Sequence, residues 1–72
     1  MESKLIKDQF ELGSQIRARR IEQGLTQGEL ADVSRVTLRF VSELERGKET
    51  AQYAGIQRVL ASLGLDLYLK PR

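Results

Sequence analysis

The sequence predicts an all-α domain of four to five short helices, followed by a C-terminal β-strand. Asp8 and Glu11 have the three-residue spacing of a capping box, in which each side chain satisfies a free backbone N–H at a helix start. Thr26 and Glu29 repeat this spacing. The break between the helices that we expect at 27–34 and at 37–45 is too short for an antiparallel pair, so the second helix must leave at a steep angle.

Length and composition favour one small domain over residues 1–72. A chain of 72 residues is close to the size at which a domain folds alone only marginally and gains from association. The hydrophobic fraction of 40% and the charged fraction of 31% are typical of a soluble globular protein. No apolar run approaches the roughly 20 residues that span a bilayer, and no secretory signal is visible, so we expect no membrane partner.

The residue types that carry much of catalysis and metal binding are absent. The chain has no cysteine and no histidine, which excludes a disulfide framework, a thiolate site and the commonest general base. There is no glycine loop that could cradle a phosphate, and the carboxylates are scattered. We therefore expect no catalytic residue, no metal, no cofactor and no small-molecule ligand.

The first helix is expected over residues 9–23. Leu12 and Ile16 would form its inward stripe, to which Phe10 could be added, and Gly13 would permit close approach of a neighbouring helix. Gly24 follows as a left-handed C-terminal residue.

Further helices are expected at 27–34, 37–45 and 51–63. Thr37 is an acceptable N-cap for the third of the four helices. Apolar residues at helical spacing should face the core, namely Leu30, Ala31, Val41, Leu44, Ile56, Val59, Leu60 and Leu63.

Residues 65–70 change period, because leucines alternate there with polar or aromatic residues, which predicts a strand. A single strand cannot satisfy its own backbone. The favoured solution is antiparallel pairing with a second copy of the chain about a two-fold axis. Pairing with the Leu5–Ile6 stretch and an unpaired tail are the alternatives. The residues expected at the dimer contact are Leu65, Leu67, Tyr68 and Leu69.

The net charge of +2 is mild, but the basic residues are clustered. One group lies on the first helix and comprises Arg17, Arg19 and Arg20. Another surrounds the third helix and comprises Arg35, Arg39, Arg46 and Lys48. This distribution favours a nucleic-acid surface, with an ordinary solvated helix surface as the alternative.

The run LTQGELADVSRVTLRFVSELERGK, residues 25–48, resembles the helix-turn-helix of the lambda-repressor-like, or XRE, family. With one following helix and a leucine-rich end, the chain is similar to short HipB-type antitoxins. The resemblance implies a homodimeric repressor that binds a palindromic operator in double-stranded DNA, in the bacterial cytoplasm at the nucleoid. It also implies a HipA-type kinase toxin as a partner. A standalone regulator, or an interaction module that has lost DNA binding, are the alternatives.

Side chains on the third helix that point away from Val41 and Leu44 are the candidates for reading bases. They are Thr37, Leu38, Arg39, Ser42 and Glu43. Arg39 is the leading candidate, because a guanidinium can bond guanine O6 and N7 together, with a surface contact to phosphate as the alternative. Glu43 could accept from cytosine or pair with an arginine of the protein.

The resemblance also implies contacts outside the bases. Gln27 would bind a phosphate at the start of the second helix, where free N–H groups also favour an anion. Arg46 and Lys48 match positions that touch phosphates flanking the groove. Arg20 and Glu45 match an ion pair that fixes the angle of the third helix.

Four residues depart from the family pattern. Val33 stands where a charge is common, which predicts either an added contact surface or a larger core. Leu38 and Phe40 stand where a polar and a small polar residue are usual, and Arg35 stands where glycine is usual. Phe40 is expected either to pack against the first helix or to lie against DNA. Arg35 either adopts a strained left-handed conformation or belongs to a helix that ends differently.

Overall fold

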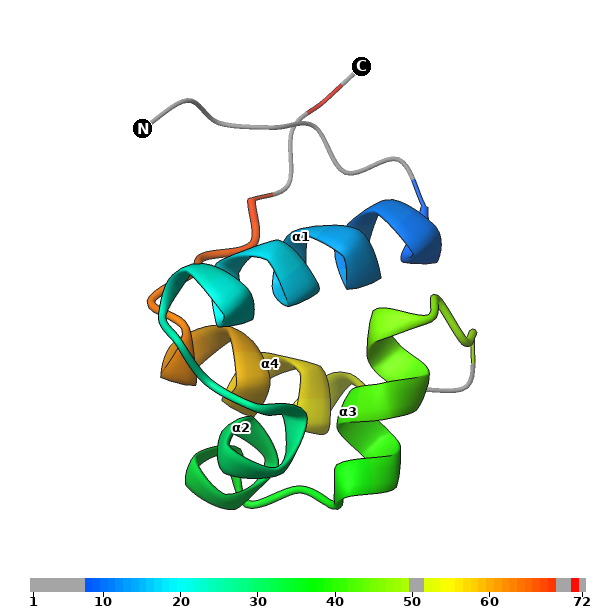
Figure 1. Cartoon of the computed structure of the whole chain (residues 1–72). Helices are drawn as coiled ribbons and strands as arrows, with labels where there is room; N and C mark the ends of the chain where they lie inside the picture. Colours follow the sequence, from blue (N-terminus) through cyan, green and yellow to red (C-terminus); the bar gives the residue numbers. More distant parts are fainter. Residues whose placement is uncertain (1–7, 50–51, 69–70, 72) are drawn as a thin grey trace.

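A computed structural model describes residues 8–49, 52–68 and 71. These residues contain four helices, α1 (Gln9–Glu22), α2 (Gln27–Ser34), α3 (Leu38–Glu45) and α4 (Tyr53–Ser62). Helix α1 lies across the top of the view and contacts α3, while α2, below it, packs against both α3 and α4 (Figure 1). The predicted all-α fold is confirmed.

The helix starts follow the predicted capping pattern. The Thr26 hydroxyl accepts a hydrogen bond from the Glu29 backbone N–H at 3.0 Å, and the Glu29 carboxylate accepts one from the Thr26 backbone N–H at 2.9 Å. The latter bond lowers the pKa of the Glu29 carboxyl. At α1, the Asp8 carboxylate accepts from the Glu11 backbone N–H at 2.9 Å. Local sequence therefore determines where α1 and α2 begin.

The core is formed by the apolar residues that the helical spacing selected. It comprises Ile16, Leu30, Ala31, Val41, Leu44, Val59, Leu60 and Leu63. Leu12 and Ile56, also predicted to face inward, are partly buried against this cluster. Val33 is 62% exposed and therefore does not extend the core.

Gly13 lies where α1 crosses the end of α3. A Cβ atom at this position would clash with the Leu44 carbonyl oxygen and would lie 2.8 Å from the Glu45 carbonyl oxygen. The predicted close approach of a neighbouring helix at Gly13 is confirmed, and the neighbour is α3.

Phe40 packs within the protein, but its partner was not predicted. Its ring is half-buried against the core, and a Cβ atom on Gly55 of α4 would lie 2.5 Å from Phe40 Cζ. The sequence suggested the first helix as the packing partner, whereas the structure brings α4 against the ring. The absence of a side chain at Gly55 makes room for the aromatic ring.

Arg35 ends α2 in the left-handed region, with φ 58° and ψ 43°. Of the two alternatives for this turn, the chain adopts the strained one. Among the described residues, Arg35 is the non-glycine residue with positive φ. Since a left-handed L-residue costs roughly 1–2 kcal/mol, the turn between α2 and α3 stores strain.

Arg35→Gly should therefore raise the free energy of unfolding by about 1 kcal/mol, after subtracting the extra chain entropy of glycine. Urea denaturation monitored by circular dichroism measures this difference. Arg35→Ala is the matched control, because it removes the side chain and retains the strain. If both variants have the same stability, the left-handed strain is not the cause.

The chain leaves α4 through a turn at Gly64, which has φ 67°. The Leu63 carbonyl oxygen at the end of α4 accepts hydrogen bonds from Arg19 Nε at 3.0 Å and Gln23 Nε2 at 3.1 Å. This contact ties the end of α4 to α1.

Residues 65–68 have no regular secondary structure in the single chain, so the predicted strand is not formed there. Residues 69 and 70, including Leu69, lie outside the described residues, as does the alternative partner at Leu5–Ile6. Leu65 packs against the core, whereas Leu67 and Tyr68 are 41% and 81% exposed. A strand requires a partner, and pairing with a second copy requires a second chain.

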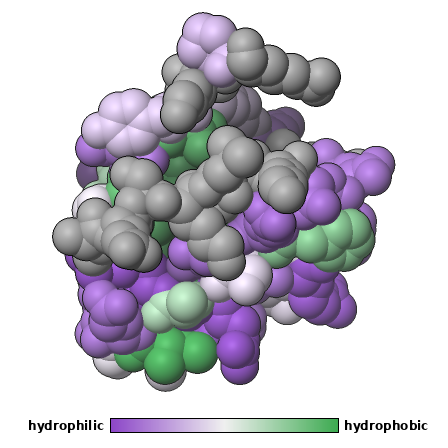
Figure 2. Space-filling view, turned by 90° about the horizontal axis from the view of Figure 1, so that it is seen from above, coloured by the Kyte–Doolittle hydropathy of each residue, from purple (hydrophilic) through white to green (hydrophobic). Residues whose placement is uncertain are grey.

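Viewed from the side of α1, the surface is mainly hydrophilic, with several separate hydrophobic patches (Figure 2). Ile21 of α1 is 51% exposed. Phe10 does not join the inward stripe of α1 as predicted: it is 61% exposed, because the first turn of α1 lies beside Gly47 and outside the core. None of the helices in the described ranges is long and apolar enough to cross a membrane.

Candidate nucleic-acid interface

Helix α3 divides its residues between the core and the surface. Val41, Leu44 and Glu45 are buried. Leu38 is 55% exposed and the Arg39 side chain is 82% exposed. The exposed residues occupy the first turn of α3, which is the part of a recognition helix that reaches base edges.

Two further predicted residues complete this surface. Thr37 is exposed, and its hydroxyl caps α3 by accepting a hydrogen bond from the Phe40 backbone N–H at 2.9 Å. Ser42 is partly exposed. Thr37 therefore already has a structural role, which leaves the hydroxyl proton available to a ligand.

Glu43 has partners within the protein. Its carboxylate oxygen Oε2 accepts a hydrogen bond from Lys48 Nζ and lies 3.6 Å from Arg39 Nε. The hydrogen bond from Lys48 lowers the pKa of the Glu43 carboxyl. Of the two alternatives for Glu43, pairing inside the protein occurs in this structure, and the closer cation is a lysine.

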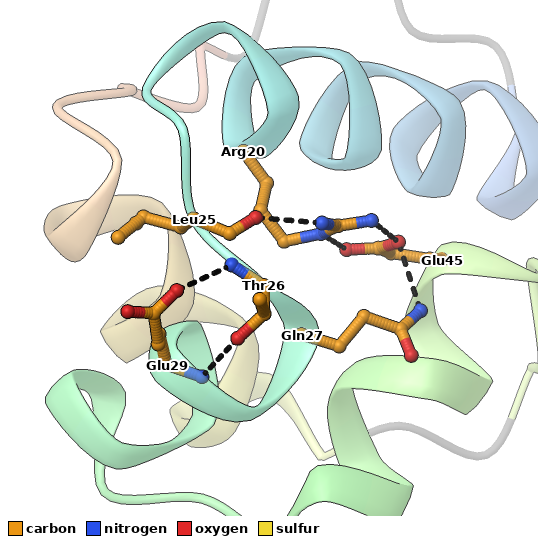
Figure 3. Close-up of polar contacts among 6 residues, drawn as sticks. All are labelled: Arg20, Leu25, Thr26, Gln27, Glu29 and Glu45. Atoms are coloured by element: carbon orange, nitrogen blue, oxygen red, sulfur yellow. Dashed lines mark hydrogen bonds and ion pairs between the residues drawn. The ribbon is translucent and has the colours of Figure 1, made fainter.

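Arg20 and Glu45 form a two-bond ion pair between α1 and α3 (Figure 3). Arg20 Nε donates to Glu45 Oε2 at 2.7 Å, and Arg20 Nη2 donates to Glu45 Oε1 at 3.0 Å. Arg20 Nη1 donates to the Leu25 carbonyl oxygen at 2.8 Å. The hydrogen bond to Glu45 raises the pKa of Arg20. This pair links α1 to the C-terminal turn of α3, as the resemblance implied.

Gln27 joins the same carboxylate from α2. Its Nε2 donates to Glu45 Oε1 at 3.1 Å, so the amide is oriented across the gap between α2 and α3 (Figure 3). The sequence did not predict this contact, because the spacing of residues within a helix does not show which residues of two helices meet. Glu45 therefore connects three helices.

Arg46 and Lys48 flank Gly47 just after α3. Gly47 has φ 83°, and a Cβ atom there would lie 3.0 Å from Phe10 Cα. Arg46 is exposed and forms no ion pair with another described residue, whereas Lys48 is held by Glu43. Positive charge thus adjoins the C-terminal end of α3.

No group of three or more carboxylate, imidazole or thiol side chains within the described part of the chain could hold a metal ion.

The sequence model of the helix-turn-helix family matches residues 16–69. A curated relative from Sinorhizobium fredii (strain NBRC 101917 / NGR234), an uncharacterized HTH-type transcriptional regulator called y4mF, is 45% identical over 65 residues. The match covers 90% of this chain and 86% of the relative.

Solved structures show the same fold. The HipA-HipB-O2-O3 complex contains a chain with a TM-score of 0.87 and 23% identity, which covers 96% of this chain and 97% of that chain. The HipB-O4 20mer complex gives a TM-score of 0.86 with the same identity and the same coverage. The clp gene regulator ClgR from Corynebacterium glutamicum gives a TM-score of 0.71 at 37% identity, over 79% of this chain and 61% of that chain.

The capped helix pair α2 and α3, the family match over most of the chain and the 45% identical regulator agree with one another. The chain therefore belongs to the XRE-type helix-turn-helix family of transcriptional regulators.

Proposed function

We propose that this protein is a repressor that binds a specific sequence of double-stranded DNA with α3 in the major groove. The proposal rests on the contrast between the first and last turns of α3. Its first turn presents exposed side chains, while Glu45 in its last turn is held by Arg20. An exposed reading end on a firmly held helix is what sequence readout requires.

Arg39 is the principal base-reading residue in this proposal. Its side chain is 82% exposed on the first turn of α3, and a guanidinium can bond guanine O6 and N7 together. Leu38 would contact a thymine methyl group, since its side chain offers no hydrogen bond. Thr37 and Ser42 would add polar contacts at the edges of the site.

The phosphate contacts come from Gln27, Arg46 and Lys48. Gln27 is the first residue of α2, where backbone N–H groups are free to bind an anion. Arg46 is a candidate phosphate contact because its side chain is exposed and forms no ion pair with another described residue. These contacts would position α3 without reading sequence.

The active form would be a homodimer on a palindromic operator, with the two α3 helices in successive major grooves roughly 34 Å apart. The exposure of Leu67 and Tyr68 supports a contact between copies through the predicted strand at 65–70. Leu65 packs on its own core and would anchor that strand. Leu69 would complete the apolar side.

Within this function, we propose a HipB-like antitoxin that also binds a HipA-like kinase toxin. The fold match to HipB over 96% of this chain supports it, one of the matched structures being a HipA-HipB complex. A regulator without a toxin is the alternative, favoured by the 45% identical HTH-type regulator. Co-expression with the product of a neighbouring kinase-like gene, followed by size-exclusion chromatography, separates the two.

Arg39→Ala should weaken binding to the cognate duplex by about 1–3 kcal/mol and relax preference at one base pair of each half-site. The cognate duplex is first recovered by selection from a random pool, and affinities are then measured by fluorescence anisotropy. Arg39→Lys is the matched control, because it keeps the positive charge for a phosphate but cannot form the two bonds to guanine, so it should lose the base preference and keep more of the affinity. Unchanged affinity and preference in Arg39→Ala would favour an interaction module that does not read DNA.

Removal of residues 67–72 should convert the dimer to a monomer, because it deletes the exposed part of the predicted strand and leaves Leu65 on the core. Sedimentation equilibrium measures the mass, and thermal unfolding reports whether the domain remains folded. Affinity for a palindromic duplex should fall with the mass, while binding to a single half-site remains. A truncated protein that stays dimeric contradicts this part of the proposal.

A further inference from the structure

One carboxylate lies among the cations of the surface proposed to face DNA. Glu43 Oε2 accepts a hydrogen bond from Lys48 Nζ and lies 3.6 Å from Arg39 Nε. The Glu43 side chain is 21% exposed, less than either cation. The hydrogen bond from Lys48 lowers the pKa of the Glu43 carboxyl, which favours its charged form. The two cations and one anion together carry a single net positive charge.

We propose that Glu43 is a specificity-determining residue that weakens binding to non-cognate DNA, and that it does not read a base. The inference rests on the DNA-binding function proposed above. It assigns Glu43 to the cations beside it, because the Glu43 carboxylate contacts Lys48 and Arg39 within the protein.

Non-cognate binding depends almost entirely on cations that neutralise phosphates. A phosphate bound by Lys48 or Arg39 would lie close to the Glu43 carboxylate, which pairs with both cations. The like charges of the carboxylate and the phosphate oppose this binding. Glu43 therefore weakens non-cognate binding, which depends on contacts between cations and phosphates.

Binding to the cognate sequence is opposed less by Glu43 than binding to non-cognate DNA. Arg39 and Glu43 are four residues apart on α3 and share one face of the helix. With Arg39 Nε toward Glu43, the two terminal nitrogens of the guanidinium remain free for guanine O6 and N7. Lys48 has three N–H donors, so it can contact a phosphate and keep its hydrogen bond to Glu43. The carboxylate thus orients Arg39 in the mode that reads sequence.

Glu43→Gln tests this inference, because glutamine retains an oxygen acceptor for Lys48 and removes the charge. Affinity for a random duplex should rise on the order of threefold to tenfold. Its salt slope should steepen by about 0.9 for each Lys48 that gains a phosphate. Affinity for the cognate duplex should change less, so that the ratio of cognate to random affinity falls on the order of fivefold.

Two further variants test the cause. Glu22→Gln removes the same charge from an exposed pair with Arg19 at the end of α1, and should leave random-duplex affinity within about twofold of wild type. Lys48→Met removes the cation and should lower random-duplex affinity. Thermal unfolding of each variant verifies the fold.

The outcomes are distinct. If Glu43→Gln loses cognate affinity and leaves random-duplex affinity unchanged, Glu43 reads a base and the inference is overturned. Unchanged affinity for both duplexes also overturns it, while the DNA-binding function stands. Wild-type protein that binds neither duplex overturns the proposed function and this inference together.

Discussion

Replacement of Glu45 by alanine is expected to lower the free energy of unfolding by about 3–5 kcal/mol. The Glu45 carboxylate accepts from Arg20 Nε, Arg20 Nη2 and Gln27 Nε2, and the side chain is 2% exposed. Its removal leaves the Arg20 guanidinium, itself 11% exposed, without its counter-charge. A domain of this length has a stability of about 4–10 kcal/mol, so Glu45→Ala should lose a large part of it.

Urea denaturation of single and double variants measures this effect. The double variant Arg20→Met with Glu45→Leu should recover much of the loss, because it leaves no buried charge unpaired. Glu22→Ala, which removes an exposed ion pair with Arg19, is the control and should change stability by less than about 1 kcal/mol. Equal losses for Glu45→Ala and Glu22→Ala would show that burial does not strengthen the pair.

Gly13→Ala is expected to destabilise the domain by about 1–3 kcal/mol, although alanine is the better helix former. The added methyl group would meet the carbonyl oxygens of Leu44 and Glu45, and these are backbone atoms that cannot rotate away. Helix α1 must then move away from α3. This movement would also stretch the ion pair between Arg20 and Glu45.

Gly28→Ala is the matched control for Gly13→Ala. A Cβ atom at Gly28 would have Thr26 Oγ1 at 3.9 Å as its nearest neighbour, so nothing opposes the helix preference of alanine. Gly28→Ala should raise the free energy of unfolding by up to about 1 kcal/mol. Differential scanning calorimetry should give shifts of opposite sign in the two melting temperatures. A stabilised Gly13→Ala would contradict the tight crossing of α1 and α3.

Local features of the fold were predictable from the sequence, because their causes lie within a few residues of each other. The capping box of Thr26 and Glu29 has both of its hydrogen bonds, and Thr37 caps α3. Helical spacing identified the buried residues Val41 and Leu44. The same spacing identified the outward face of α3, since residues that do not face the core must face solvent.

Contacts between helices were less predictable. Phe40 packs against α4 because Gly55 leaves room for its ring. Gly55 is 15 residues away in the sequence, and no pattern around it indicates this contact. The bond from Gln27 to Glu45 likewise depends on how α2 and α3 cross. The partners of Glu43 depend on a loop that returns Lys48 over α3.

The sequence by itself determined the starts of α1, α2 and α3, the core stripes and the exposed first turn of α3, because capping and periodicity act over short distances. Helix α4, predicted from residue 51, starts at Tyr53, where Gln52 makes no side-chain cap. Only the tertiary structure decided that Arg35 takes the strained turn, since packing of α2 against α3 sets that angle. The same packing brings Glu45 to Arg20 and Gln27. The contacts of Glu43 are local by comparison: Arg39 lies four residues away on α3, and Lys48 follows the turn at Gly47, which has φ 83°.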